Sequence, residues 1–257
     1  MRNLKRKLAI LLSGGSSSVR FYLLRWIARL VMPDYRLRWH TLDWWNDSDF
    51  NAYLARFGET DSLNIDRRWV IHQLLRLIAD TPGDTAECGV YRGATSFLIC
   101  KANQQTTKHE RTHFMFDSFE GLSEPHPSDG RYWRKGDLSA GEAVVQQYLQ
   151  GCENAVFMKG WIPDRFGEVA ERRFSFVHID VDLYEPTRHA VEFFYPRLND
   201  GGILVFDDFG FTTCPGAMIA IKEAAGNISD QVIALPDGGG FLIKGRSVAR
   251  AAKLTNS

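Results

Sequence analysis

The sequence has no net charge, no closely spaced cysteine pair and no long uncharged apolar run. Lys plus Arg and Asp plus Glu both number 31, which argues against a protein that binds nucleic acid non-specifically. The cysteines Cys88, Cys100, Cys152 and Cys214 form no CxxC motif or zinc spacing, which favours buried, reduced thiols. No stretch reaches transmembrane length without a charge, and residues 1–12 match a signal peptide poorly. The sequence therefore predicts a cytoplasmic protein.

A length of 257 residues suits one α/β domain with an N-terminal appendage, which we place at residues 66–250 and 1–65. Residues 1–40 hold nine basic side chains and one acid, Asp34. Within them, residues 19–32 have the pattern of a basic amphipathic helix. We favour a helix that packs on its own domain or on a second subunit in a homo-oligomer. The alternative is peripheral contact with an anionic membrane through residues 1–38.

After a predicted helix at residues 67–79, the pattern alternates between strand and helix to the end of the chain. The expected strands are Thr85–Gly89, Thr112–Asp117, Ala155–Lys159, Phe174–Asp180, Ile203–Asp207, Gln231–Leu235 and Gly240–Lys244. The helices expected between them are Ala94–Asn103, Gly141–Gln150, Pro163–Glu168, Pro186–Leu198 and Pro215–Ala225. Only a tight turn at residues 236–239 joins the last two strands, so the last strand should be antiparallel. We predict a Rossmann-like, doubly wound α/β fold with a mostly parallel seven-stranded sheet.

Two acidic clusters follow continuously apolar strands. Asp180 and Asp182 end the run from Phe174, and Asp207-Asp208 end the run from Gly202. Ligands of open α/β sheets bind outside the carboxyl ends of the strands, so these side chains should meet at one edge. Like charges repel there unless a cation lies between them. The sequence therefore predicts a metal site in an enzyme. We leave His178 out of this site, because a histidine in a buried strand is more often a hydrogen-bonded core residue.

The turn after the first strand, ECGVYRGATS from Glu87, has the spacing G-x-x-x-G. That spacing disfavours NAD, whose motif is G-x-G-x-x-G. Glu87, just before the first glycine, suits a ligand with an ammonium group. Asp117 ends the second strand, where an acid commonly binds ribose hydroxyls. The loop between Phe119 and Leu138 is long and rich in turn formers, so we expect a lid over the substrate that carries residues 131–135.

Taken together, AECGVYRGATS, FDSFEGL, KGWIPD, HIDVDLYEPT and LNDGGILVFDDFG resemble the macrocin O-methyltransferase family, over about residues 67–244. The resemblance implies an enzyme that uses S-adenosylmethionine and Mg²⁺ to methylate sugar hydroxyls. It implies that the methionine part of the cofactor is surrounded by Glu87, Gly89, Tyr91 and Gly93. The ribose would be held by Asp117 and Ser118, and the adenine would lie beside Gly160 and Trp161. It also implies Asp180, Asp207 and Asp208 as metal ligands, and we nominate Asp182, beside Asp180, as the general base.

The chemistry agrees with these roles. A sugar hydroxyl is a poor nucleophile at neutral pH, and a divalent cation on oxygen ligands lowers the pKa of a hydroxyl that it contacts. A nearby carboxylate can then take the proton. The sequence therefore predicts methylation of a glycoside, glycolipid or polysaccharide. Two alternatives stay open: a catechol-type O-methyltransferase that acts on an aromatic diol, and a non-catalytic membrane-surface binding protein with the same fold.

Overall fold

The computed structural model describes residues 15–32 and 42–246, apart from positions 107, 109, 227 and 229. The chain divides into two compact units, with the boundary between Arg56 and Phe57. The extension predicted from the sequence ends at residue 65, which lies in the second unit.

The N-terminal unit contains helix α2, Gly15–Val31, the 3₁₀ helix η1, Asp43–Asn46, and most of helix α3, Ser48–Phe57. Helix α2 includes most of the helix predicted over residues 19–32, and its side chains Trp26 and Leu30 are exposed. Helix α3 was not predicted, because its apolar positions lie in a polar, tryptophan-rich stretch. Within the described residues, no helix combines the length and apolar character needed to cross a membrane.

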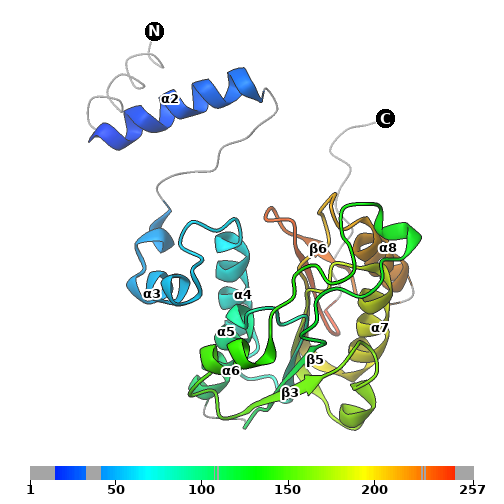
Figure 1. Ribbon diagram of the computed structural model, residues 1–257. Coiled ribbons are helices and arrows are strands. Elements are labelled where there is room, and N and C mark those ends of the chain that lie inside the picture. Colours follow the sequence, from blue (N-terminus) through cyan, green and yellow to red (C-terminus); the bar gives the residue numbers. More distant parts are fainter. Residues whose placement is uncertain are drawn as a thin grey trace. The chain divides into compact units, whose positions relative to one another are not determined.

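The second unit is built on a seven-stranded sheet in the order β3-β2-β1-β4-β5-β7-β6 (Figure 1). Its strands are β1 Asp84–Cys88, β2 His113–Asp117, β3 Ala155–Lys159, β4 Phe174–Ile179, β5 Leu198–Phe206, β6 Ile233–Ala234 and β7 Gly240–Ile243. Strands β1 to β5 pair in parallel, and β7 is antiparallel to both β5 and β6. The predicted mostly parallel sheet with an antiparallel last strand is confirmed.

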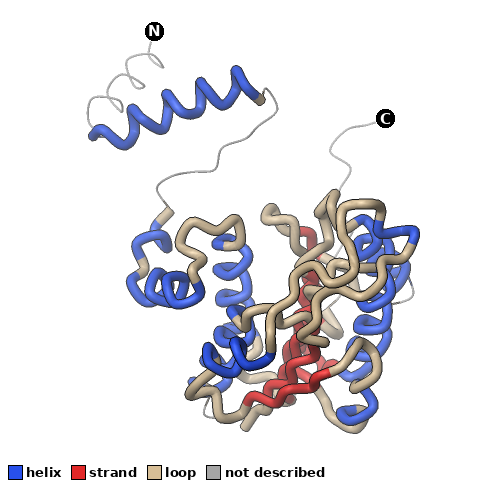
Figure 2. The backbone as a smooth tube through the Cα atoms, in the orientation of Figure 1, coloured by secondary structure: helices blue, strands red, loops and turns tan. Residues whose placement is uncertain are grey.

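Helices cover both faces of this sheet (Figure 2). Helices α4 Ile65–Leu77, α5 Ala94–Gln105 and α6 Glu142–Tyr148 lie on one side, and α7 Tyr184–Phe194 and α8 Pro215–Gly226 lie on the other (Figure 1). The doubly wound architecture is thereby confirmed. The helix predicted at Pro163–Glu168 is wrong, because only the 3₁₀ turn Phe166–Val169 forms there. The segment is short and contains Gly167, and such segments favour 3₁₀ turns over an α-helix.

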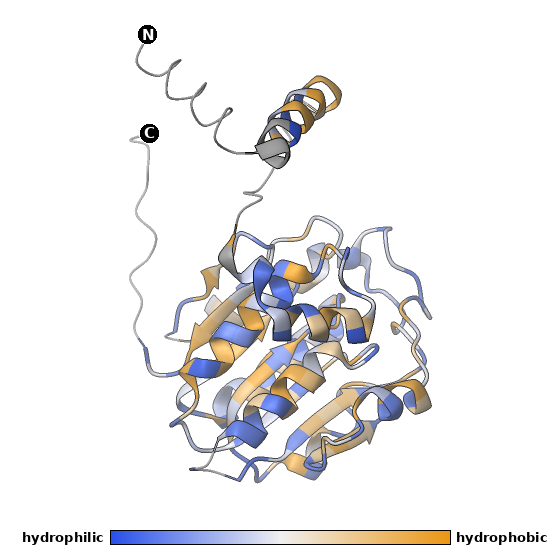
Figure 3. Cartoon of the chain, turned by 90° about the vertical axis from the view of Figure 1, so that its left-hand side faces the viewer, coloured by the Kyte–Doolittle hydropathy of each residue, from blue (hydrophilic) through white to orange (hydrophobic). Residues whose placement is uncertain are grey.

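Aromatic side chains fill the core between β4 and α7. Every residue of β4 is buried, and the strands are among the most apolar segments in Figure 3. Phe194 of α7 is fully buried and meets the rings of Phe116, Phe166 and Phe174 edge-on, with centroids 5.0 to 5.7 Å apart. Close packing of large rings leaves little freedom for the strands beneath them. The core therefore holds the carboxyl ends of β1, β4 and β5 in fixed relative positions.

Candidate active site

The two acidic segments begin where the neighbouring strands β4 and β5 end. Ile179, the last residue of β4, pairs with Cys88 of β1 on one side and with Phe206 of β5 on the other. The hydrogen bonds continue one residue further, since the Asp180 N–H donates to the Cys88 carbonyl and the Asp207 N–H to the Ile179 carbonyl, each at 2.9 Å. Sheet register therefore brings Asp180 and Asp207 to one place, as the sequence predicts for parallel strands.

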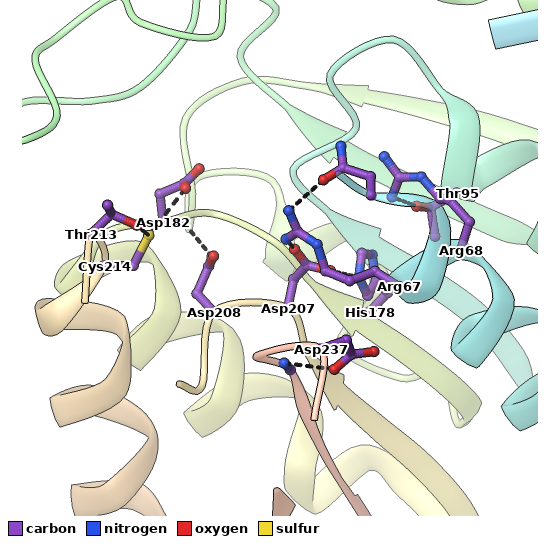
Figure 4. Close-up of polar contacts among 12 residues, drawn as sticks. Arg67, Arg68, Thr95, His178, Asp182, Asp207, Asp208, Thr213, Cys214 and Asp237 are labelled. Carbon is purple, nitrogen blue, oxygen red and sulfur yellow. Dashed lines mark hydrogen bonds and ion pairs between the residues drawn. The ribbon is translucent and has the colours of Figure 1, made fainter. Parts of the chain in front are cut away.

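Potential metal-ligand atoms form two groups at this edge. One contains His178, Asp180 and Asp207, and the other contains Asp182, Asp208 and Cys214; within each group the ligand atoms lie within 4.8 Å of one another. Figure 4 shows Asp182 and Asp208 facing each other, with Asp207 beside them. The three predicted metal ligands thus fall in both groups, and the predicted base Asp182 shares its group with Asp208.

Burial and mutual repulsion make these carboxyls reluctant to ionise without a cation. Burial, followed by the charges of Asp208 and Asp180, raises the pKa of Asp182 to about 9. Burial, followed by the charge of Asp180, raises the pKa of Asp208 to about 7. Burial also raises the pKa of the Cys214 thiol, and the charge of Asp208 adds to the effect. A bound cation would reverse these effects, so the donor set and its charge fit a divalent metal ion.

Asp182 occupies a strained turn directly after β4. Its φ is +58°, a left-handed conformation that few non-glycine residues adopt. The Leu183 N–H donates to the Val181 carbonyl at 2.6 Å, which closes a tight turn around Asp182. The Asp182 N–H donates to Asp208 Oδ2 at 3.0 Å. Strain of this kind persists where surrounding contacts enforce it, and it is concentrated at functional sites.

Arg67 of helix α4 enters the acidic site and forms an ion pair with Asp207 (Figure 4). Asn64 Oδ1 accepts a hydrogen bond from its guanidinium at 2.6 Å, and the ring of Phe211 lies 4.9 Å below it. The sequence analysis missed this residue, because Arg67 reads there as one polar position of an amphipathic helix. The structure therefore adds a positive charge to a site that the sequence suggested was purely acidic.

Glu87 has its carboxylate in the core. The residue is 1% exposed, Oε2 accepts a hydrogen bond from Ser96 and Oε1 lies 3.0 Å from His178 Nδ1. The other ring nitrogen of His178 lies 3.5 Å from Asp207 Oδ1. His178 is therefore a buried, bonded histidine between two carboxylates. Burial raises the pKa of Glu87. The contact of Glu87 with a methionine ammonium stays a prediction.

The glycine turn closes against both the sheet and helix α6. Gly89 has φ +83°, and a Cβ there would collide with the backbone carbonyl of Asp180. Gly93 has φ +84°, and a Cβ would lie 3.0 Å from Val145 of α6. Gly89 therefore requires glycine for both conformation and space, whereas Gly93 requires it chiefly for its conformation. Tyr91, between them, also has a positive φ and is 40% exposed.

Asp117, the last residue of β2, connects the end of this strand to the turn after β1. One carboxylate oxygen accepts the N–H groups of Val90 and Tyr91 at 2.7 and 3.1 Å, and the other accepts that of Phe119 at 2.7 Å. Ser118 donates to the Gly121 carbonyl at 3.0 Å. The structure thus places the predicted ribose residues next to the glycine turn.

The third strand reaches the same edge. The Gly160 N–H donates to the Asp117 carbonyl at 3.0 Å, and the half-buried Trp161 follows. The predicted adenine residues therefore lie beside the predicted ribose residues.

The loop predicted as a lid is attached to the start of helix α7. Asp129 is buried and accepts the N–H groups of Tyr184 and His126, each at 2.7 Å, while the His126 and Tyr184 rings stack. From the same loop, the Trp133 indole N–H donates to Cys214, next to the acidic site. Cys214 is the second residue that the sequence analysis missed, since scattered cysteines gave no signal of a role.

Comparison with known proteins identifies relatives of this chain. The chain is 28% identical over 177 residues to the 8-demethyl-8-(2,3-dimethoxy-alpha-L-rhamnosyl)-tetracenomycin-C 4'-O-methyltransferase of Streptomyces olivaceus, which covers 64% of this chain and 67% of that one. It is 28% identical over 165 residues to the mycinamicin III 3''-O-methyltransferase of Micromonospora griseorubida, over 59% and 65% of the two chains. The alignments thus span about two thirds of each relative.

A solved structure, that of the O-methyltransferase NovP, is similar in fold. Its TM-score is 0.59 at 26% identity, and the match covers 71% of this chain and 81% of that one. The family model for macrocin O-methyltransferases (TylF) matches residues 67–241, which is more than half of the sequence and contains the glycine turn and all four aspartates. The chain therefore belongs to the macrocin O-methyltransferase family.

Proposed function

We propose that this protein transfers a methyl group from S-adenosylmethionine to a sugar hydroxyl of a glycoside, glycolipid or polysaccharide, with Mg²⁺ in the active site. The observation that carries this proposal is the meeting of Asp180, Asp182, Asp207 and Asp208 at the sheet edge that also bears the glycine turn. Metal and cofactor sites would then adjoin, so that the acceptor oxygen and the methyl donor could meet.

Three carboxylates would hold the metal: Asp180, Asp207 and Asp208. Oxygen ligands of this kind suit a hard divalent cation such as Mg²⁺, which would keep water at its remaining positions. When bound, the ion would act as a Lewis acid that lowers the pKa of an acceptor hydroxyl in contact with it. His178, held by Glu87, would orient the Asp207 carboxylate, since a side chain behind a ligand fixes its direction.

S-adenosylmethionine would lie over the glycine turn, where it supplies an electrophilic methyl group on a sulfonium. Asp117 keeps lone pairs for the ribose hydroxyls, because each carboxylate oxygen can accept more than one hydrogen bond. Tyr91 and Gly93 would border the methionine part, and Trp161 would lie against the adenine. Glu87 is buried and hydrogen-bonded. We therefore propose that it holds His178 in place, and that it also lies beneath the methionine part.

Asp182 is the carboxylate that we propose to take the proton of the acceptor hydroxyl. Without a cation, its burial and its acidic neighbours raise its pKa to about 9, whereas a general base works best when its pKa lies near the operating pH. A nearby cation would favour its ionised form at neutral pH. The strained turn fixes the position of this side chain, which limits the loss of orientation during the reaction.

Sugar hydroxyls are the proposed acceptors because both curated relatives described above are named for O-methylation at primed positions, one of them on a rhamnosyl compound. The long loop between Phe119 and Leu138 would cover this acceptor. Its exposed Tyr132 and its half-buried Trp133 provide apolar ring surface of the kind that can pack on a sugar.

Isothermal titration tests the cofactor. The purified protein should bind S-adenosylmethionine saturably and should not bind NAD⁺, both in Mg²⁺ and in chelator. Failure to bind S-adenosylmethionine would overturn the proposed function. A screen of glycosides against catechols, with labelled methyl donor, would then identify the acceptor class, and turnover of catechols alone would refute the sugar assignment.

Replacement of a ligand tests the metal role. Asp207→Ala should abolish methyl transfer and leave S-adenosylmethionine binding largely intact, because Asp207 is placed at the metal and not at the glycine turn. Asp200→Ala is the matched control, since it removes an exposed aspartate near the other end of strand β5. Loss of cofactor binding in Asp207→Ala, with Asp200→Ala unaffected, would contradict the metal assignment.

A further inference from the structure

A side-chain connection links the long loop to the acidic site through Cys214. The indole Nε1–H of Trp133 donates to Cys214 Sγ at 3.3 Å, and the Cys214 thiol donates to Asp182 Oδ1 at 3.4 Å. Trp133 and Asp182 precede Cys214 by 81 and 32 residues, so three separate segments meet at one sulfur atom. Figure 4 shows the sulfur next to the Asp182 carboxylate, with Thr213 beside it.

Cys214 is enclosed by its surroundings. It is 2% exposed and immediately precedes Pro215, the first residue of helix α8. A thiol can donate one hydrogen bond and accept another, though weakly in both roles. At this position it does both, since it accepts from the indole and donates to the carboxylate. An apolar side chain could not replace the thiol, because both the Trp133 indole and the Asp182 carboxylate would lose this hydrogen-bond partner.

The loop that carries Trp133 is fixed on both sides of the indole. Before it, Asp129 accepts two backbone N–H groups, one of them from Tyr184 at the start of helix α7. After it, the Leu122 N–H donates to the Asp137 carbonyl at 2.8 Å, and the Gly136 N–H donates to the Leu122 carbonyl at 2.9 Å. The position of the indole N–H therefore depends on the docked loop.

We propose that Cys214 is a positioning residue, which holds the Asp182 carboxylate in the orientation that accepts the proton and couples it to the docked loop through Trp133. This inference rests on the proposed function, in which Asp182 is the base. It adds that residues outside the acidic clusters set the geometry of the base. An undocked loop would leave the Cys214 thiol without its indole donor, so acceptor enclosure and alignment of the base through Cys214 would occur together.

The alternative is that Cys214 only fills space. Two substitutions separate these roles. Cys214→Ser keeps a donor and an acceptor but is slightly smaller, whereas Cys214→Ala removes both. A purely packing residue would make the two variants similar, since both lose the bulk of sulfur. A positioning residue would make serine a partial rescue of alanine. Cys100→Ala is the control, because Cys100 is a buried thiol in an apolar cluster that contains none of the acidic residues.

The experiment measures kcat and KM for the acceptor, S-adenosylmethionine affinity by titration, and the midpoint of thermal unfolding. Cys214→Ala should lower kcat by at least about tenfold, a part of the 10²–10⁴ that general bases contribute. Its acceptor KM and cofactor affinity should change by less than about threefold. Cys214→Ser should recover most of kcat, and Cys100→Ala should keep kcat near that of the wild type.

A second pair of variants tests the link to the loop. Trp133→Phe keeps an aromatic ring and removes the N–H, so it should lower kcat by less than Cys214→Ala. The kcat of the double variant Trp133→Phe/Cys214→Ala should be no lower than that of Cys214→Ala alone, because the effects of changes along one connected chain of contacts are not additive. The same non-additivity should appear in urea unfolding of Cys214→Ala, Asp182→Asn and their double variant, which needs no activity.

Each result decides the matter. Equal losses in Cys214→Ser and Cys214→Ala, or losses that multiply in the double variant with Trp133→Phe, would overturn the positioning role and leave the proposed function intact. Additive unfolding energies for Cys214→Ala and Asp182→Asn would overturn the contact itself. A wild-type protein that binds no S-adenosylmethionine and transfers no methyl group would overturn both proposals.

Discussion

Removal of divalent cations should make the stability of this protein fall as the pH rises from about 7 to about 8. In the cation-free protein, Asp182 keeps its proton up to a pKa of about 9 and Asp208 up to about 7, chiefly because they are buried among other acids. The same carboxyls in an unfolded chain lose their protons near pH 4. The folded state therefore binds more protons than the unfolded state, so the free energy of unfolding decreases with pH until each group ionises.

The size of the effect follows from these pKa values. Between pH 7 and 8, a pKa of about 9 at Asp182 corresponds to a loss of roughly 1 kcal/mol, and Asp208 adds less than half of that, for a total of about 1–2 kcal/mol. His113, whose pKa burial lowers to about 3, gives the opposite trend, but only below its unfolded value near 6.5. Buried thiols with raised pKa, such as Cys214, contribute mainly above about pH 8. In this window, therefore, neither His113 nor the thiols dominate the change in stability.

Urea unfolding at fixed temperature, followed by circular dichroism at several pH values in this window, measures the change. Stability should fall with pH in chelator and stay nearly level in saturating Mg²⁺, because the cation keeps both carboxylates ionised in the folded state. Thiols outside the acidic site respond alike in both buffers, so the difference between the two curves belongs to the acidic site. Asp182→Asn should remove most of the slope in chelator. A stability that is level in chelator, or that falls equally in Mg²⁺, would refute the reasoning.

Two further predictions concern the glycine turn and Arg67. Gly89→Ala should destabilise the fold by several kcal/mol, because the new Cβ meets the fixed carbonyl of Asp180. Gly151 has the same φ of +83° but open space around it, so Gly151→Ala should cost only about 1–2 kcal/mol. Equal thermal unfolding midpoints for the two variants would contradict the clash. Arg67→Met should tighten Mg²⁺ binding by at least about tenfold in isothermal titration, since unit charges 4 Å apart interact by about 4 kcal/mol at an effective dielectric of 20. Weaker binding would mean instead that Arg67 orients Asp207 for the metal.

The sheet could be predicted because its signals are local. The run from Phe174 to Ile179 is apolar at almost every position, as expected for a strand covered on both faces, and the turn at residues 236–239 allows only a hairpin. Strand ends then follow, and with them the meeting of Asp180 with Asp207. Parallel topology converts a sequence pattern into a spatial one without further information, because it fixes which ends of the strands lie together.

Arg67 and Cys214 could not be predicted in this way. Each lies outside the strands that define the site and reaches it by tertiary packing, Arg67 from helix α4 and Cys214 from the residue before helix α8. The direction of the Glu87 side chain was equally hidden. Glu87 pairs with His178 in the sheet register, so its carboxylate meets that imidazole in the core. A single sequence gives the position of a residue along a strand, but the partner strand decides what its side chain contacts.

The charges of the acidic site explain why a resident arginine and a metal ion can both belong there. Four carboxylates, Asp180, Asp182, Asp207 and Asp208, and one guanidinium carry a formal charge of −3 when all are ionised. Burial makes such an excess costly, and the cation-free protein lowers it by keeping protons on Asp182 and Asp208. A divalent ion would reduce the excess to −1 without protons. The remaining negative charge is that of one free carboxylate, which is what a site needs if it is to accept one proton from a hydroxyl.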